Sequence, residues 1–225
     1  MHVAVLVPVK RFSAAKGRLV GSLDDDDRQR FARWMATGVI GSAREFPTFV
    51  ACDDDEVAEW AEQHGAHVIW GEGLGLNGAV DDGIEQIAKH DVDHIIVAHA
   101  DLPRPRNIVS VARAGCITLV PDRHRDGTNV MAFPASSPLR ASYGGGSFGR
   151  HLAQALELGA VTGDAGAGGV AGGVAVEVRA DPDLSLDLDT PGDLTHPLIR
   201  EVLPEWLRTN LDNPRVPRLH PSSQP

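Results

Sequence analysis

The stretch VAVLVPVKRFSAAKGRL, residues 3–19, sets the architecture to expect. Its first half is almost wholly apolar, which is typical of a strand covered by helices on both faces. Its second half is a loop of small residues that carries four cations within nine residues: Lys10, Arg11, Lys16 and Arg18. Ligands of open α/β sheets bind beyond the carboxyl ends of the strands. The loop therefore favours a bound triphosphate, and the alternative is a solvated basic loop.

Outward from this stretch, short β-rich runs alternate with helical patterns along most of the chain. This alternation predicts an α/β fold whose central sheet is mostly parallel and flanked by helices. The predicted strands are 2–9, 48–53, 67–70, 94–100, 117–121, 129–133 and 174–178. The predicted helices are 22–44, 54–64, 78–90, 105–114, 147–158 and a last stretch, 191–211, divided by Pro197 and Pro204.

The chain is long enough for one domain, which we expect to span residues 1–211. Within it, the Gly/Ala-rich tract at 159–173 has few side chains to bury, so it is predicted to be a flexible loop or lid. The tail at 212–225 contains four prolines and is predicted to be extended or disordered. Cys52 and Cys116 lie in apolar runs and are interpreted as buried structural thiols.

Composition limits the classes of partner. A formal charge of -10 and a pI near 5.4 argue against nucleic acid, so an anionic nucleotide must be met by local charge or by a metal. No apolar run approaches the roughly 20 residues of a membrane span, and the first strand lacks the features of a signal peptide. We expect a soluble, cytoplasmic protein without a membrane partner. A homodimer, formed through an edge strand or the last helix, is compatible with the sequence.

Carboxylates follow two predicted strands. Asp101 ends the run that begins at residue 94, and Asp187 and Asp189 stand two positions apart, on one face if the chain is extended there. Oxygen ligands of this kind suit Mg²⁺, so we predict that these three carboxylates share a metal site. In the alternative interpretation, Asp189 caps the helix that begins at Pro191. The acidic run at 24–27, in contrast, is interpreted as capping a helix N-terminus rather than binding metal.

Glycine-rich turns supply candidate anion seats. One turn, 71–78, contains Asn77, which is interpreted either as a helix N-cap or as a nucleotide contact. The Asp-Gly-Thr-Asn turn at 126–129 leads Thr128 into a strand. A triple glycine from Gly144 precedes Ser147 at a predicted helix start, where free N–H groups, a hydroxyl and the helix dipole favour a phosphate or carboxylate. The alternative for this last turn is a glycine hinge with Ser147 as N-cap.

Taken together, these segments resemble the guanylyltransferase family of coenzyme F-420 biosynthesis, whose members act on 2-phospho-L-lactate or phosphoenolpyruvate. The resemblance runs in order through PVK at 8–10, AKGRL at 15–19, LN at 76–77, ADLP at 100–103, DGTN at 126–129, GGSF at 145–148 and LDLDTP at 186–191. It implies a GT-A-like nucleotidyltransferase fold. It also implies transfer of GMP from GTP to a small phosphorylated carboxylic acid, with release of pyrophosphate.

Roles follow from the resemblance position by position. Asp101, Asp187 and Asp189 would hold Mg²⁺. Thr128, Gly144 and Ser147 would contact the phospho-acid. GTP would be served by Lys16, Arg18 and Asn77, with Lys10 in the same basic loop, and Lys16 would also act in catalysis.

Two alternatives stay open. A related nucleotidyltransferase of the molybdenum-cofactor or sugar-phosphate type would keep the fold, but such enzymes usually carry a Gly-Gly-x-Ser/Thr-x-Arg turn that this N-terminal loop lacks. A GTP-binding module that has lost catalysis would keep the binding residues without the chemistry. The presence of all three carboxylates disfavours this second alternative.

Overall fold

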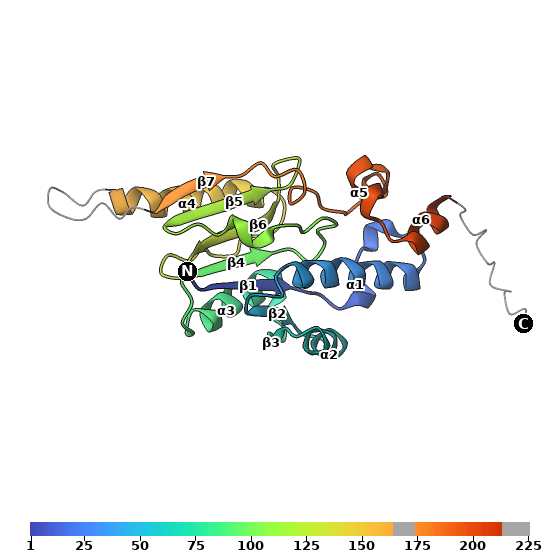
Figure 1. Ribbon diagram of the computed structural model, residues 1–225, viewed down its shortest axis with the longest axis horizontal. Coiled ribbons are helices and arrows are strands. Elements are labelled where there is room, and N and C mark those ends of the chain that lie inside the picture. Colours follow the sequence, from blue (N-terminus) through green and yellow to red (C-terminus); the bar gives the residue numbers. More distant parts are fainter. Residues whose placement is uncertain (164–173, 213–225) are drawn as a thin grey trace, which may run out of the picture.

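The computed structural model describes residues 1–163 and 174–212, which form a seven-stranded sheet with helices on both faces (Figure 1). The strands lie in the order β3-β2-β1-β4-β6-β5-β7, with β1 and β4 near the middle. Their bounds are β1 Val3–Pro8, β2 Thr48–Cys52, β3 His67–Trp70, β4 His94–Ala98, β5 Cys116–Pro121, β6 Thr128–Pro134 and β7 Ala175–Val178. All seven strands expected from the sequence are confirmed.

The sheet is parallel except for β6, which runs antiparallel to both β4 and β5. The exception follows from a short connection: only residues 122–127 separate β5 from β6, and a parallel pair needs a long crossover. The carboxylate of Asp122 closes this reversal by accepting N–H groups from His124, Asp126 and Gly127 at 2.8, 3.1 and 2.6 Å. The prediction of a mostly parallel sheet is therefore confirmed.

Two apolar layers cover the sheet. Helices α1 (Asp25–Ser42) and α2 (Asp55–Gln63) pack with the side chains of Val3, Val5 and Val7 on one face. Helices α3 (Gly75–Ile87) and α4 (Ser147–Gly163) pack on the other face, where Ala4 and Leu6 point. Alternate residues of β1 point to opposite layers, and Val3 to Val7 are all buried, so this part of the strand had to be apolar throughout.

A third apolar cluster joins the C-terminal helices α5 (Pro197–Val202) and α6 (Glu205–Asp212) to the outer side of α1. In Figure 1 both helices lie beyond the carboxyl ends of the parallel strands. Leu186 and Leu188 are buried in this cluster, whereas Asp187 and Asp189 between and after them are half-buried. This alternation confirms that the two carboxylates share one side of an extended segment.

Several boundaries differ from expectation. The helix predicted at 105–114 is wrong: only a single 3-10 turn forms, Ile108–Val111, preceded by Asn107 in the left-handed region (φ 56°). The left-handed Asn107 interrupts the segment, and the β-branched residues Ile108, Val109 and Val111 disfavour a longer helix.

Helix α4 does not end at Gly159 but continues to Gly163. The physical role of Gly159 is close packing, because a Cβ there would lie 3.3 Å from the carbonyl oxygen of Val174. The flexible loop predicted at 159–173 is therefore helical in its first five residues, and its remaining part, 164–173, lies outside the described residues. The predicted tail also lies outside them beyond residue 212.

Other expectations hold. Asp24 is the N-cap of α1 and accepts the N–H of Asp27 at 2.8 Å, which confirms the capping role of the acidic run. Pro197 opens α5, and Pro204 separates it from α6. Cys52 and Cys116 are buried free thiols. Over the described part of the chain, none of the helices combines the length and apolarity that crossing a membrane requires.

Candidate functional site

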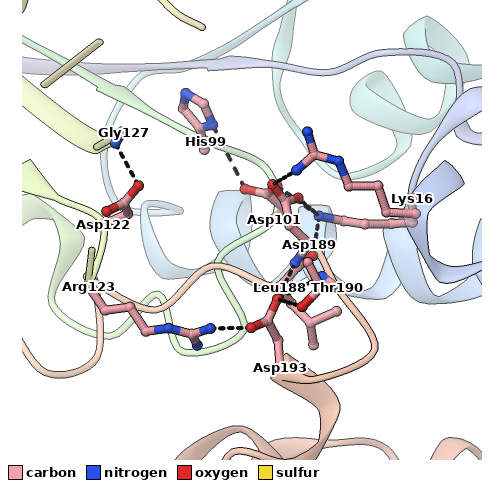
Figure 2. Close-up of polar contacts among 11 residues, drawn as sticks. Lys16, His99, Asp101, Asp122, Arg123, Gly127, Leu188, Asp189, Thr190 and Asp193 are labelled. Atoms are coloured by element: carbon pink, nitrogen blue, oxygen red, sulfur yellow. Dashed lines mark hydrogen bonds and ion pairs between the residues drawn. The ribbon is translucent and has the colours of Figure 1, made fainter. Parts of the chain in front are cut away.

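The carboxyl ends of β1 and β4 bring a buried lysine to two carboxylates (Figure 2). The ammonium group of Lys16 donates to Asp101 Oδ2 at 2.7 Å, to Asp189 Oδ1 at 3.2 Å and to the carbonyl oxygen of Leu188 at 2.5 Å. Only 8% of the Lys16 side chain is exposed. We call Lys16, Asp101 and Asp189 the charged cluster. Asp101 and Asp189, which are 85 and 173 positions from Lys16 in the sequence, thus meet it at one point.

The conformation of the basic loop turns Lys16 inward. Two 3-10 turns, Phe12–Ala14 and Gly17–Leu19, flank the lysine, and the buried side chains of Phe12 and Leu19 anchor them. Lys16 between them is left-handed at φ 56°, a conformation that costs a non-glycine residue roughly 1–2 kcal/mol. The three hydrogen bonds of its ammonium group offset this strain, so a functional constraint on the loop is indicated.

The charges of the cluster support one another. Burial by itself lowers the pKa of Lys16, but Asp101 and Asp189 outweigh it and the pKa is raised. Burial likewise opposes ionisation of Asp101, yet Lys16 and His99 hold the pKa of that carboxyl below its usual range. Lys16 and Asp101 therefore form a charged pair at neutral pH.

Asp187 carries the unbalanced charge of the site. Burial, followed by repulsion from Asp101, Asp189 and Asp122, raises the pKa of Asp187 to about 6. One oxygen of Asp101, Oδ1, is buried without a hydrogen-bond partner in the described structure. An excess of carboxylate and an unsatisfied oxygen are the features that a hard cation would satisfy.

The three predicted metal ligands are nevertheless not preassembled. Among residues 1–163 and 174–212, no three His, Cys, Asp or Glu side chains are placed to hold one metal ion. Lys16 instead lies between Asp101 and Asp189. Since Mg²⁺ commonly takes only one or two protein carboxylates and completes its shell with phosphate oxygens and water, the donor set still fits such an ion.

Two neighbouring cavities open at this edge of the sheet. The larger, about 370 Å³, is lined by Lys10, Lys16, Arg18, Asp101 and Asp189 together with apolar residues of α1. The smaller, about 190 Å³, shares Lys10 with the first and extends over the ends of β2 and β3 to the 71–75 turn. Their combined size suits a nucleotide, whose pockets are typically several hundred Å³.

The remaining cations of the basic loop are more exposed. Arg18 lies with its guanidinium 3.6 Å from Asp189 Oδ2, and 76% of its side chain is exposed. Lys10 lines both cavities and is exposed. Both side chains are free to move toward a bound anion, in contrast to Lys16.

Of the two roles considered for Asn77, the structure excludes the helix N-cap, and the nucleotide contact stays a prediction. Helix α3 begins at Gly75 with Leu74 at the N-cap, so the N-cap interpretation of Asn77 is wrong. Its side chain instead bonds the main chain of Tyr143, accepting the N–H at 2.7 Å and donating to the carbonyl at 3.4 Å. Asn77 thus joins α3 to the turn that contains Gly144, and its neighbour Leu76 lines both cavities.

The three predicted acceptor residues, Thr128, Gly144 and Ser147, lie close to His151, which was not predicted, and we call these four residues the acceptor seat. Thr128 Oγ1 lies 3.0 Å from Nδ1 of His151. The Nε2 atom of His151 accepts the N–H of Ser142 at 2.9 Å, so Nδ1 carries the proton and donates to Thr128. Burial, with Arg150 and His99 nearby, lowers the pKa of His151 to about 4 and keeps the ring neutral.

The side chain of Arg150 holds the glycine turn of the acceptor seat through hydrogen bonds to main-chain carbonyls. Arg150 donates to the carbonyl of Ser142 at 2.7 and 3.1 Å and to that of Gly145 at 2.7 Å. Gly144 is at φ 119°, which favours glycine. Ser147 starts α4 and is buried, as expected, but Thr128, Gly144 and Ser147 are not among the residues lining the two cavities.

A row of three rings in edge-on contact connects the acceptor seat with the charged cluster. His99 packs edge-on against Tyr143 at 4.6 Å between centroids, and Tyr143 packs against His151 at 5.0 Å. Nδ1 of His99 lies 3.9 Å from Asp101 Oδ1, and burial lowers the pKa of His99. Sequence reasoning missed these three residues. The spacing of His151, one helical turn after Ser147, was the available signal for one of them.

Solved structures of other proteins share the fold of this chain. A crystal structure from Desulfovibrio desulfuricans G20, described as a nucleotide-diphospho-sugar transferase, has the same fold with a TM-score of 0.67, 14% identity and coverage of 93% of this chain and 96% of that one. A nucleotidyl transferase from Methanothermobacter thermautotroptrophicus also has this fold, with a TM-score of 0.56 and 15% identity. The match covers 93% of this chain and 99% of that one. At these identities the likeness concerns the fold alone.

Sequence similarity gives the family. The chain belongs to the family described as "Guanylyl transferase CofC like", which matches residues 3–162. It is 33% identical to the phosphoenolpyruvate guanylyltransferase of Rubrobacter xylanophilus, over 86% of this chain and 92% of that protein. It is 31% identical to the protein of the same name from Sphaerobacter thermophilus, over 86% and 91%. The expected family and enzyme class are confirmed.

Proposed function

We propose that the chain transfers GMP from GTP to a three-carbon phospho-acid, phosphoenolpyruvate or 2-phospho-L-lactate, in coenzyme F-420 biosynthesis. The observation that carries the proposal is the charged cluster at the mouth of the 370 Å³ cavity. The printed names of the relatives favour phosphoenolpyruvate as the first acceptor to test. Guanine as the base also rests on those names and on the family.

In the proposed reaction, a phosphate oxygen of the acid attacks the α-phosphorus of GTP. A new bond forms between that oxygen and phosphorus, the bond to the bridging oxygen breaks, and pyrophosphate leaves. The acceptor phosphate is already ionised at neutral pH, so no side chain needs to remove a proton. Positioning and charge neutralisation then supply the rate enhancement.

The cations of the basic loop would bind the triphosphate. Lys10 and Arg18 are exposed at the cavity and can approach the β- and γ-phosphates. Lys16 has three donors and can exchange one carboxylate partner for a phosphate oxygen as the nucleotide enters.

Mg²⁺ is the proposed cofactor, held by Asp101, Asp187 and Asp189 with the phosphates of GTP. When bound it would neutralise charge on the triphosphate and on the leaving pyrophosphate. The fit rests on the unpartnered Oδ1 of Asp101 and on the raised pKa of Asp187. A cation beside Asp187 would stabilise the ionised form of this side chain and lower its pKa.

The acceptor seat would hold the acid. Thr128 and Ser147 contribute hydroxyl groups, and Gly144 contributes main chain in a conformation that places it close to a ligand. The neutral His151 fixes the orientation of Thr128 without adding a charge.

Pyrophosphate release tests the proposal. The purified chain is incubated with Mg²⁺, each of GTP, ATP and CTP, and each of phosphoenolpyruvate, 2-phospho-L-lactate and a sugar phosphate. Release that requires GTP and a three-carbon phospho-acid is the expected result. Pyrophosphate release only with a sugar phosphate would show that the acceptor is a sugar phosphate and not a three-carbon acid. GTP binding without pyrophosphate release in any combination would refute catalysis.

A further inference from the structure

A second buried aspartate lies next to the charged cluster without belonging to it. Asp193 begins the 3-10 turn Asp193–Thr195, and only 5% of its side chain is exposed. Its Oδ2 atom accepts three hydrogen bonds: from the N–H of Asp189 at 2.9 Å, the N–H of Thr190 at 2.7 Å and the hydroxyl of Thr190 at 3.0 Å. A buried carboxylate is tolerated because its oxygens are satisfied in this way.

The other oxygen of Asp193 faces a different element. Arg123, from the turn between β5 and β6, donates to Oδ1 and forms an ion pair with it (Figure 2). That turn is itself held by the bonds of Asp122 to the main chain. Asp193 is therefore fixed between a rigid turn of the sheet and the segment that carries Asp189.

Hydrogen bonds hold the main chain on both sides of Asp189, at the peptide groups of residues 188 to 190. On one side, Leu188 is buried and its carbonyl accepts Lys16 at 2.5 Å. On the other side, the N–H groups of Asp189 and Thr190 both end on Asp193. The side chain of Asp189 is 45% exposed and pairs with Lys16 and Arg18 of the basic loop. The fixed main chain sets the point from which this carboxylate reaches those cations.

We propose that Asp193, held in place by Arg123, is a positioning residue that directs the carboxylate of Asp189 toward the cation and triphosphate. The proposal rests on the proposed function for the identity of those ligands. It does not make Asp193 a ligand, because both of its oxygens already face protein donors. Partners of this outer kind typically change metal affinity 10- to 100-fold when they are removed.

The chain offers a matched control in Asp183. Arg104 pairs with Asp183 at 2.5 Å and also bonds Glu201 and the carbonyl of Leu198, at 2.9 and 3.1 Å. Like Arg123, Arg104 ties the C-terminal segment to a loop at the sheet. This pair contacts neither Asp189 nor Thr190. Asp183→Asn therefore reports the effect of loosening that segment without touching Asp189.

The test measures Mn²⁺ binding by electron paramagnetic resonance, with GTP present, in the full-length wild type, Asp193→Asn and Asp183→Asn. Asp193→Asn is expected to weaken Mn²⁺ binding roughly 10- to 100-fold. The Mg²⁺ concentration for half-maximal turnover should rise by a similar factor. Asp183→Asn should leave both quantities within about twofold while lowering the melting temperature. Thr190→Val, which removes one of the three donors, should give a smaller shift than Asp193→Asn.

Equal Mn²⁺ affinity in Asp193→Asn and the wild type would overturn the proposal, and so would an equal loss in Asp183→Asn. If Asp193→Asn does not fold, Arg123→Gln and Thr190→Val replace it, and unchanged Mn²⁺ affinity in both overturns the proposal. Wild-type turnover decides the proposed function separately. A wild type that binds Mn²⁺ but transfers no GMP would refute the function while the Mn²⁺ comparison still judges Asp193.

Discussion

The charged cluster and the acceptor seat lie on the same sheet but are built from different interactions. Lys16, Asp101 and Asp189 meet through full charges on side chains, and the pKa values of Lys16 and Asp101 depend on one another. The acceptor seat contains glycine main chain, hydroxyl groups and a histidine whose pKa of about 4 keeps it neutral. One region concentrates charge, and the other avoids it.

This difference separates two tasks. Charge near a triphosphate stabilises a transition state, so losses in the charged cluster should lower kcat. Neutral hydrogen bonds shape a seat for one acid, so losses there should raise the KM for that acid and leave the KM for GTP unchanged. Substitutions in the two regions test whether this division holds.

The largest effect is expected for Asp189→Asn, which keeps the shape of the side chain but removes its charge. Turnover should fall roughly 1000-fold, because the cation that neutralises the triphosphate loses one of its proposed carboxylate ligands. The fold should persist, since 45% of the side chain is exposed. Steady-state kinetics and circular dichroism check both points, with Asp26→Asn, an exposed residue of α1, as the control. Near-normal turnover would remove Asp189 from the site.

Lys16→Met should affect activity and stability together. Turnover is expected to fall roughly 100-fold. Loss of the ammonium also leaves the largely buried Asp101 without its ion-pair partner, which should cost about 3 kcal/mol of unfolding free energy. Urea unfolding measures this cost, and Lys89→Met, at an exposed position of the chain, is the control. A variant as stable as the wild type would show that Lys16 does not neutralise the cluster.

Asp187→Asn should stabilise the protein while reducing its activity. The folded pKa of Asp187, about 6, lies above the ordinary value of 3.8, so ionisation of this carboxyl costs stability as the pH rises through 6. Without divalent cations, the variant should therefore gain about 2 kcal/mol over the wild type at pH 7 and almost nothing at pH 4. Thermal unfolding at both pH values measures the difference. A gain of the same size at both would contradict electrostatic repulsion as its cause.

Thr128→Val should have the smallest effect, confined to the acceptor seat. The KM for the acid is expected to rise about tenfold, because the variant loses a hydroxyl and leaves Nδ1 of His151 without an acceptor. The KM for GTP should not change. Thr118→Val, at a buried threonine of the adjacent strand β5, is the control. An equal rise in both KM values would show that the two regions do not act separately.

Much of the fold was predictable from the chain because its signals are local. Buried strands such as β1 are continuous apolar runs, and Asp24 caps a helix three residues from its partner. The helix expected at 105–114 does not form, because Asn107 is left-handed and β-branched residues follow it, so the proline and glycine that flank the segment were not sufficient signals. Gly159 misled for a related reason: a glycine that allows close packing looks in sequence like one that ends a helix.

The site was predictable only in part because its contacts are distant in sequence. The rule that ligands bind at the carboxyl ends of strands selected Lys16, Asp101 and Asp189, which the fold does bring together. No local signal reveals that Asn77 bonds Tyr143, 66 residues away. Asp193 was missed although Thr190-Pro191-Gly192-Asp193 has the spacing of a helix capping box, a pattern that would have indicated the bond between its ends.

Transfer of a labelled nucleotide tests the proposed GMP transfer most directly. GTP carrying radioactive phosphorus at the α position is incubated with the wild-type chain, Mg²⁺ and phosphoenolpyruvate or 2-phospho-L-lactate, and the products are separated by chromatography. We expect the label to move into a new compound containing GMP and the acid, only when Mg²⁺ is present and not with Asp189→Asn. Label that remains in GTP, with either acid, would contradict the account.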